Sequence, residues 1–246
     1  MTNTPVLLVI AHGSRDPRHA ATVHALVRRV RSLRPDVRVE TGFLDFNVPS
    51  AQGVLESLAV QGVRDVVALP LLLTRAFHAK ADIPAVLAEA PPQLRIRQAE
   101  VLGPSPLLLS ALERRLYRAG LSPADKPSTG VVLASAGSTD PEAIAVIAEI
   151  AREWRHTGWC AVRPAFASAS LPRTEDAVRE LRALGCSRVA VAPYVLAPGF
   201  LPDRIARGAA EADVLADVLG PAPEVARVVL ERYETARVPV LAAVSA

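Results

Sequence analysis

Two histidines and one aspartate in the first half of the chain stand where side chains can do chemistry. His12 lies in VIAHGSRDP, Asp45 in GFLDFNVPS and His78 in PLLLTRAFHAKADIP. Neutral imidazole is a common ligand for divalent first-row metals, and a carboxylate can complete such a site or take protons. The three residues therefore point to a metal site or an acid–base site, provided that the fold brings them together.

The surrounding elements predict an open parallel sheet with helices on both faces. Apolar runs predict strands at 6–11, 37–43, 65–72 and 93–99, and segments of helical periodicity predict helices at 18–34, 50–61, 81–90 and 105–118. Asp16 can cap the first helix, and Pro17 suits its first turn. Each of the three candidate residues follows a strand, and ligands of open α/β sheets collect at the carboxyl ends of the strands.

The second half of the sequence repeats the order of the first. A proline-rich segment at 121–129 is expected as a linker, after which AGSTDP matches HGSRDP, VAVAP matches VVALP and VLGPAP matches VLGPSP. We expect an α/β fold of two tandem, similar, doubly wound domains, each with a mainly parallel four-stranded sheet. Their predicted bounds are residues 1–121 and 122–246.

A comparison of the two copies distinguishes residues that the fold requires from residues that could have a chemical role. The glycines and prolines that punctuate the unit occur twice, whereas the candidate titratable groups occur once. The aligned pairs are His12 with Ala136, Asp45 with Ser168, and His78 with Leu201. A residue needed only for folding would be expected in both copies, so the asymmetry favours a chemical role for the three.

The other histidines and the two cysteines are expected to be structural. His19 and His24 lie five positions apart on the first helix, which does not stack them on one face. His156 falls at a helix end, where the dipole favours a cation. Cys160 and Cys186 are expected as small buried side chains rather than a redox pair.

Composition narrows the classes of function. The longest apolar run contains Pro70 and is too short to span a bilayer, and the 28 basic residues form no stripe typical of nucleic-acid binding. No dinucleotide-binding glycine motif or P-loop follows either first strand. Two cysteines and a start unlike a signal peptide favour the cytoplasm. We expect no membrane, nucleic-acid or nucleotide partner.

HGSR after the first strand, GFLDFNVPS and PLLLTRAFHAKADIP together resemble the class II tetrapyrrole chelatases of the sirohydrochlorin chelatase type, the cobalt (CbiX) and iron (SirB) enzymes. VAPYVLAPGFLPDRI is similar to the C-terminal half of their long two-domain form. The resemblance implies that two domains face each other across a cleft for a flat macrocycle. It also implies that His12 and His78 bind the metal and that His12 accepts pyrrole protons. The acid after the second strand is usually glutamate in this family. The side chain of Asp45 is one methylene shorter, so its carboxylate is expected to lie farther from the metal.

The resemblance further implies ATP-independent insertion of Fe²⁺ or Co²⁺ into sirohydrochlorin, in siroheme or cobalamin biosynthesis, with Ni²⁺ as a third candidate metal. The metal is then a substrate, no nucleotide cofactor is needed, and the fused repeat is expected to work as a monomer. Lys80 and Arg204 are additional candidates to meet the carboxylates of the macrocycle. The expected substrate contacts are Ser14, Arg15, Asp45, Leu72, Leu73, Thr74, Arg75, Ala76 and Phe77.

The residues leave two other functions open. A non-catalytic protein that stores or delivers a metal or a tetrapyrrole would use the same cleft and bind without turnover. A small hydrolase or phosphoryl-transfer enzyme would use His12 or Ser14, but HGS lacks the G-x-S-x-G context of a nucleophile elbow.

Overall fold

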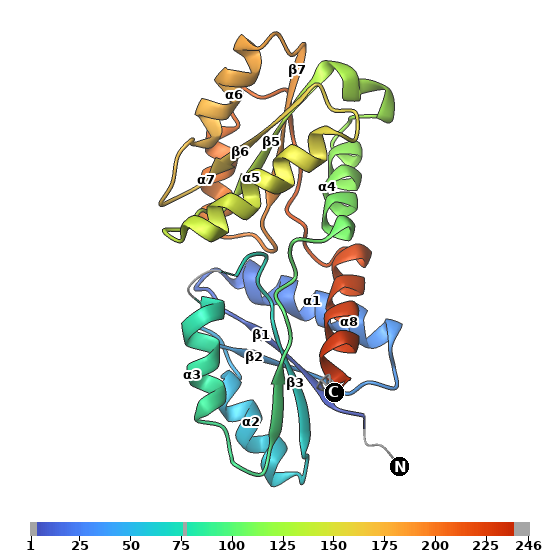
Figure 1. The fold of residues 1–246 in the computed structure, drawn as a ribbon, viewed down its shortest axis with the longest axis vertical. Helices are drawn as coiled ribbons and strands as arrows, with labels where there is room; N and C mark the ends of the chain where they lie inside the picture. The colour runs from blue at the N-terminus through green and yellow to red at the C-terminus, as the bar shows by residue number, and fades with distance from the viewer. Residues whose placement is uncertain (1–3, 76–77, 239–246) are drawn as a thin grey trace, which may run out of the picture.

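The computed structural model describes residues 4–75 and 78–238, which form two α/β units placed end to end (Figure 1). The first half contains β1 (Val6–Ala11), α1 (Pro17–Leu33), β2 (Val39–Phe43), α2 (Ala51–Val60), β3 (Asp65–Pro70), a π-helix (His78–Asp82), α3 (Ile83–Ala88), β4 (Arg95–Gln98) and α4 (Pro106–Arg118). The second half contains a 3-10 helix (Pro123–Ser128), β5 (Thr129–Ser135), α5 (Pro141–Arg155), β6 (Ala161–Phe166), α6 (Thr174–Ala183), β7 (Arg188–Tyr194), α7 (Phe200–Gly208), β8 (Val214–Leu215) and α8 (Pro223–Arg237).

Each half is built on one parallel four-stranded sheet, as the sequence predicts. The strand orders are β2-β1-β3-β4 and β6-β5-β7-β8, so the two sheets share one topology. All six side chains of β1 are buried, which explains why its sequence VLLVIA is apolar throughout: helices cover both faces of the sheet. Because β1 pairs with β3, with Ile10 opposite Pro70, the loops that follow these two strands begin side by side.

The last helix of each half packs on the sheet of the other half (Figure 1). Helix α8 contacts α1, β3 and β4 of the first half, whereas α4 contacts β7 of the second, and the two helices also contact each other. A single buried cluster therefore contains Leu112 of α4, Val229 of α8 and residues of both sheets. The predicted domain boundary between residues 121 and 122 stays a prediction. The contacts show that one helix of each half packs on the sheet of the other half.

Matching arginines on the two exchanged helices bind the repeated VLGP turns. Arg115 of α4 donates from Nη2 to the Leu219 carbonyl at 2.8 Å. Arg232 of α8 donates to three carbonyl oxygens at 2.9–3.1 Å, those of Val101, Leu102 and Pro104. The duplication thus includes polar contacts that join the halves.

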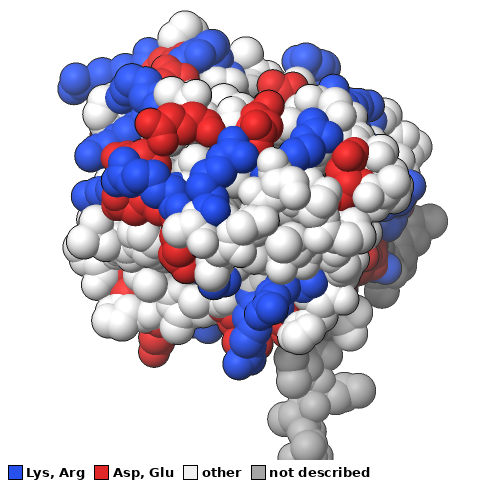
Figure 2. All heavy atoms as spheres, turned by 90° about the horizontal axis from the view of Figure 1, so that it is seen from above, with Lys and Arg blue, Asp and Glu red and all other residues white. Residues whose placement is uncertain are grey.

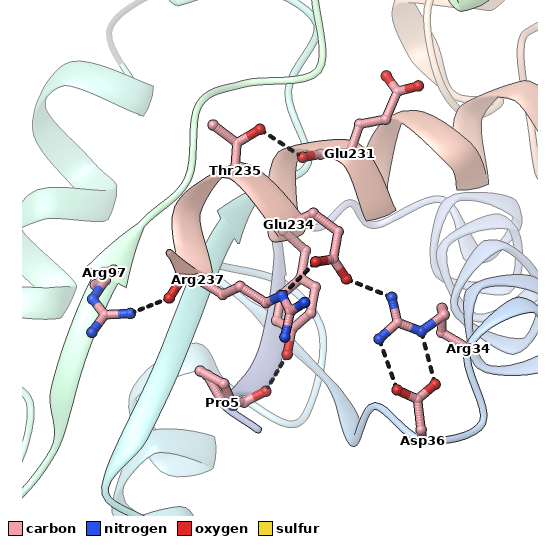
Figure 3. Close-up of polar contacts among 9 residues, drawn as sticks. Pro5, Arg34, Asp36, Arg97, Glu231, Glu234, Thr235 and Arg237 are labelled. Atoms are coloured by element: carbon pink, nitrogen blue, oxygen red, sulfur yellow. Dashed lines mark hydrogen bonds and ion pairs between the residues drawn. The ribbon is translucent and has the colours of Figure 1, made fainter. Parts of the chain in front are cut away.

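The end of α8 is tied to the first half by further polar contacts (Figure 3). Glu234 accepts from Arg34, which follows α1, and from Arg237 within its own helix. The Tyr233 hydroxyl donates to the Pro5 carbonyl at 2.7 Å. These contacts place the end of α8 beside the start of β1.

The segment at 121–129, expected as a linker, contains the 3-10 helix. Asp125 accepts from the Ser122 backbone N–H and hydroxyl, both at 2.7 Å, and Pro123 suits the first turn. Within the described residues, no helix is long and apolar enough to cross a membrane. On the face shown in Figure 2, cationic and anionic side chains intermingle rather than gather into a stripe of one sign.

Candidate functional site

A cavity of about 430 Å³ lies between the two halves, where the carboxyl ends of β1, β3, β5 and β7 meet. Its volume is in the range of small-molecule sites, and most of its wall is apolar. The residues that line it include His12, His19, Leu72, Leu73, Ser138 and Tyr194. Both halves therefore contribute to one site at the sheet edge where the sequence places the chemistry.

The loop that carries His12 is fixed by its contact with the loop after β2. The His12 carbonyl accepts from the Asp45 backbone N–H at 2.9 Å. Gly13 has φ of +95°, and a Cβ built there would lie 1.9 Å from the Asp45 carbonyl oxygen. Only glycine permits this close approach, so the glycine of HGS places the His12 and Asp45 backbones next to each other.

The helix after His12 starts where the sequence predicts. Asp16 accepts from the Arg18 N–H at 2.9 Å and caps α1, with Pro17 in the first turn. Ser14 takes part in the same turn: its Oγ accepts from the Asp16 N–H at 3.1 Å, and its own N–H donates to Asn47 Oδ1 at 2.8 Å. The substrate contact predicted for Ser14 stays a prediction.

His12 lies on the cavity wall and is partly exposed. Its Nδ1 is 3.1 Å from the Gly13 carbonyl oxygen, which can only accept a hydrogen bond. This contact favours the tautomer protonated at Nδ1, in which Nε2 carries the lone pair that a metal or a proton requires.

Asp45 is exposed beside the His12 loop and outside the cavity wall. Its Oδ1 accepts from the Phe46 N–H at 2.7 Å. The backbones of Asp45 and His12 are thus brought together as predicted, whereas direct contact of Asp45 with a metal or with substrate stays a prediction.

Leu72, Leu73 and Thr74 line the same cavity as His12. They follow β3, which is the neighbour of β1, and this adjacency explains why residues about 60 positions apart in the chain share one wall. Their position fits the predicted contact with the face of a macrocycle.

Ala76 and Phe77 lie outside the described residues, and so does the side chain of His78. The His78 backbone begins the π-helix, a kind of helix that is frequent at functional sites. The metal-binding role of His78 and the substrate contacts of Ala76 and Phe77 therefore stay predictions. Among the described residues, no group of three or more His, Cys, Asp or Glu side chains is arranged to hold a metal ion.

Arg75 and Lys80 line a second cavity and not the one beside His12. Arg75 Nη1 is 4.0 Å from Glu100, and both side chains are exposed. Lys80 Nζ donates to Asp140 at 2.8 Å and to Glu142 at 2.7 Å, which raises the pKa of Lys80. Lys80 therefore joins the two halves, and it would have to leave both carboxylates to meet a substrate anion.

His19 lines the cavity beside His12, although its helical spacing led us to expect a structural role. Its Nδ1 is buried without a hydrogen-bond partner among the described residues. Burial lowers the pKa of His19, and the nearby His12 lowers it further. The repeat alignment, applied to this position, sets His19 opposite Ala143, which lines the same cavity. This difference between the two copies is the sequence signal that could have identified His19 as a cavity residue.

The remaining histidines and the cysteines lie away from the cavity wall. The His24 ring packs edge-on against Phe43 with centroids 5.7 Å apart, and His156 caps α5. Cys186 is buried as expected, whereas Cys160 is exposed, and their Sγ atoms are 3.5 Å apart.

Comparison with known proteins shows the same architecture. The CbiX family model matches residues 6–119 and again 130–236. Sirohydrochlorin cobaltochelatase of Priestia megaterium is 29% identical over 206 residues, which are 81% of this chain and 66% of that protein, a little under two thirds of its length. Sirohydrochlorin ferrochelatase of Bacillus subtilis is 27% identical over 207 residues, 82% of this chain and 77% of that protein.

Two solved structures of a related chelatase cover nearly the whole chain. SirB from Bacillus subtilis with Fe³⁺ has a TM-score of 0.80 and 26% identity, covering 95% of this chain and 96% of that one. SirB from Bacillus subtilis subspecies spizizenii in complex with cobalt has a TM-score of 0.78 and 25% identity, covering 96% and 97%. With the family model matched once in each half, the chain belongs to the CbiX family.

Proposed function

We propose that this chain inserts Fe²⁺ or Co²⁺ into sirohydrochlorin. The observation that carries the proposal is the position of His12, at the end of β1 on a cavity shared by both halves, where the repeat has Ala136. The cobaltochelatase and ferrochelatase relatives, and the iron and cobalt complexes of SirB, agree with it.

The chemistry requires a ligand for the incoming metal and an acceptor for two pyrrole protons. His12 can serve as either, because a neutral imidazole binds metals and accepts protons through a ring nitrogen, and the contact of its Nδ1 with the Gly13 carbonyl favours Nε2 for this role. We assign metal binding to His12 and His78, and proton transfer to His12 with Asp45 beside it. Few ligands hold the ion, so the ion can leave the protein for the four ring nitrogens.

The cavity wall would hold the macrocycle against His12. Leu72 and Leu73 offer apolar contact to its face, and Thr74 a hydroxyl at the edge. Arg15 is exposed near His12 and suits a carboxylate of the substrate. Arg75 and Arg204, both exposed, are further candidates.

Iron, cobalt and nickel suit the same nitrogen and oxygen ligands, so we propose that supply decides between Fe²⁺ and Co²⁺, with Ni²⁺ also accepted. The reaction needs no nucleotide, because the chain supplies both the ligands and the proton acceptor. We further propose that the chain acts as a monomer in the cytoplasm, since its own two halves complete the cavity.

The test is an anaerobic assay of purified protein with sirohydrochlorin and each metal in turn, followed by the absorption change of the macrocycle. We expect acceleration over the buffer rate, unchanged by added ATP. No acceleration with any of the three metals would reject the chelatase, and tight macrocycle binding without turnover would instead indicate a delivery protein.

A further inference from the structure

Phe46 is an exposed aromatic residue beside the proposed metal ligand. Its relative exposure is 49%, and its ring centroid lies 6.2 Å from that of His12, at an interplanar angle of 39°. The guanidinium carbon of Arg15 lies 5.2 Å from the same ring, within cation–π distance. An apolar ring, a cation and the candidate catalytic imidazole thus lie together on the loops that follow β1 and β2.

The backbone of Phe46 adopts a conformation that bulky residues rarely take. Its φ is +59°, in the left-handed region, and its N–H is held by the Asp45 carboxylate at 2.7 Å. Ala169 occupies the matching place in the second half, with φ of +61°. The turn is therefore a property of the repeated loop, whereas the phenyl ring occurs only in the half that carries His12.

The loop geometry does not explain why the ring is there. In both copies the turn is closed by a backbone hydrogen bond, from Asn47 to Asp45 at 2.7 Å and from Ser170 to Ser168 at 2.6 Å. Alanine fills the position in the second copy, so a small side chain meets the needs of the fold. A half-exposed phenyl ring in strained backbone is better explained by a ligand that covers it.

The chemistry of the pair defines that ligand. A phenyl face stacks on flat conjugated rings, and a guanidinium binds carboxylates, often in two parallel hydrogen bonds. Arg15 is exposed and its guanidinium lies over the Phe46 ring, so its charge can meet an anionic group. A flat, conjugated ring with carboxylate arms, centred near His12, fits both features.

We propose that Phe46 and Arg15 form a stacking platform beside His12, which binds the face of one ring of the macrocycle and one of its carboxylates. The inference rests on the proposed function, which supplies a flat, polyanionic substrate. It adds Phe46 as a substrate-binding residue, which fixes the orientation of the macrocycle over the metal ligand.

The test compares Phe46→Ala, Phe46→Trp and Val48→Ala with the wild-type protein. Binding of metal-free sirohydrochlorin is titrated by absorbance and fluorescence, and kcat and KM are then measured with Co²⁺. Phe46→Ala should weaken binding about tenfold and raise KM with little change in kcat, because stacking is lost while the metal ligands remain. Phe46→Trp should retain binding. Val48 is an 85% exposed apolar residue of the same loop, so Val48→Ala should behave as wild type.

The outcomes separate the platform from the chelatase. If wild type turns over and Phe46→Ala binds the macrocycle as tightly as wild type, the platform is wrong and the proposed function stands. An equal loss of affinity in Phe46→Ala and Val48→Ala would also overturn it, because the loop as a whole would then be responsible. If wild type binds without turnover, the proposed function fails, and the binding titrations still decide on the platform.

Discussion

At the scale of single residues, His12 and its repeat equivalent Ala136 occupy equivalent turns, one in each half. The Ala136 carbonyl accepts from the Ser168 N–H at 3.0 Å, as the His12 carbonyl accepts from Asp45 at 2.9 Å. The turn is held by backbone, so His12→Ala should fold with an unchanged melting temperature. It should lose at least about 100-fold in the rate of metal insertion, since the proposed metal ligand and proton acceptor is removed. Circular dichroism and the absorbance assay check both, and an unfolded or fully active variant would contradict us.

His19 predicts a pH dependence of stability. Burial lowers its pKa in the folded state below the unfolded value near 6.5, so the unfolded chain binds the proton more readily. The stability from neutral His19 is therefore complete above that unfolded value. It is lost as pH falls below it toward the folded pKa.

The measurement is the melting temperature of wild type and His19→Ala between pH 7.5 and about 5. As the pH falls, the melting temperature of wild type should decrease more steeply than that of the variant. The variant carries alanine at position 19, as the second half does at the matching Ala143. Thr22→Ala, on the same helix and without a titratable side chain, is the control and should keep the pH dependence of wild type. Parallel curves for wild type and His19→Ala would show that burial of this imidazole has no effect on stability.

Sequence predicts residues that follow strands better than residues whose orientation depends on packing. The sequence predicts the position of His12 after a strand because both copies contain its turn, whereas only the first contains its imidazole. The sequence analysis tests His19 only against His24, the other histidine of α1. Its neighbour in the cavity is instead His12, which follows β1, and helical spacing does not reveal this pairing. The sequence does not predict the place of Phe46, because a phenylalanine gives no sign that its backbone adopts the left-handed conformation.

At the scale of elements, the order and type of the strands and helices follow from hydrophobic periodicity, and the parallel sheets are confirmed. The exchange of α4 and α8 could not be predicted. Each is an amphipathic helix after a VLGP turn, and its apolar face fits either of two similar sheets. Periodicity gives the face that is buried but not the sheet that buries it.

The exchange makes Arg232 a structural residue. Its guanidinium donates to three carbonyl oxygens of the loop after β4, so Arg232→Ala removes the donor of two partly buried hydrogen bonds and one exposed hydrogen bond. We expect a loss of about 2–3 kcal/mol in the free energy of unfolding, measured by urea titration. Arg227→Ala, on the exposed face of α8, should change it by less than about 0.5 kcal/mol. Equal effects of the two substitutions would show that the loop contacts do not stabilise the fold.

At the scale of the whole molecule, ion pairs also join the halves around the cavity. Lys80 of the π-helix binds Asp140 and Glu142 at the start of α5, and Arg18 of α1 donates to Asp203 of α7 at 2.8 Å. Both cations are exposed, so each ion pair adds little stability by itself. The buried cluster shared by α4, α8 and both sheets is what holds the halves together.

That shared core predicts the behaviour of the first half alone. A fragment of residues 1–121 lacks α8, so Val67 and Leu69 of β3 lose part of their cover, while α4 loses the sheet on which it packs. Because α4 and α8 are repeat equivalents, α4 of one copy can take the place of α8 on a second copy. We therefore expect a folded dimer and no folded monomer, as measured by light scattering with circular dichroism over a range of concentrations.

In such a dimer Arg115 would take the place of Arg232 and bind the VLGP turn of the partner fragment. Arg115→Ala should therefore weaken the fragment dimer by about tenfold or more, because a charged donor to buried carbonyls is worth about 1.5–3 kcal/mol. Arg118→Ala, at the exposed end of α4, is the matched control and should leave dimerisation unchanged. A fragment that folds as a monomer would mean that α4 can return to its own sheet, and the exchange would then be a consequence of fusing the halves rather than a requirement of each.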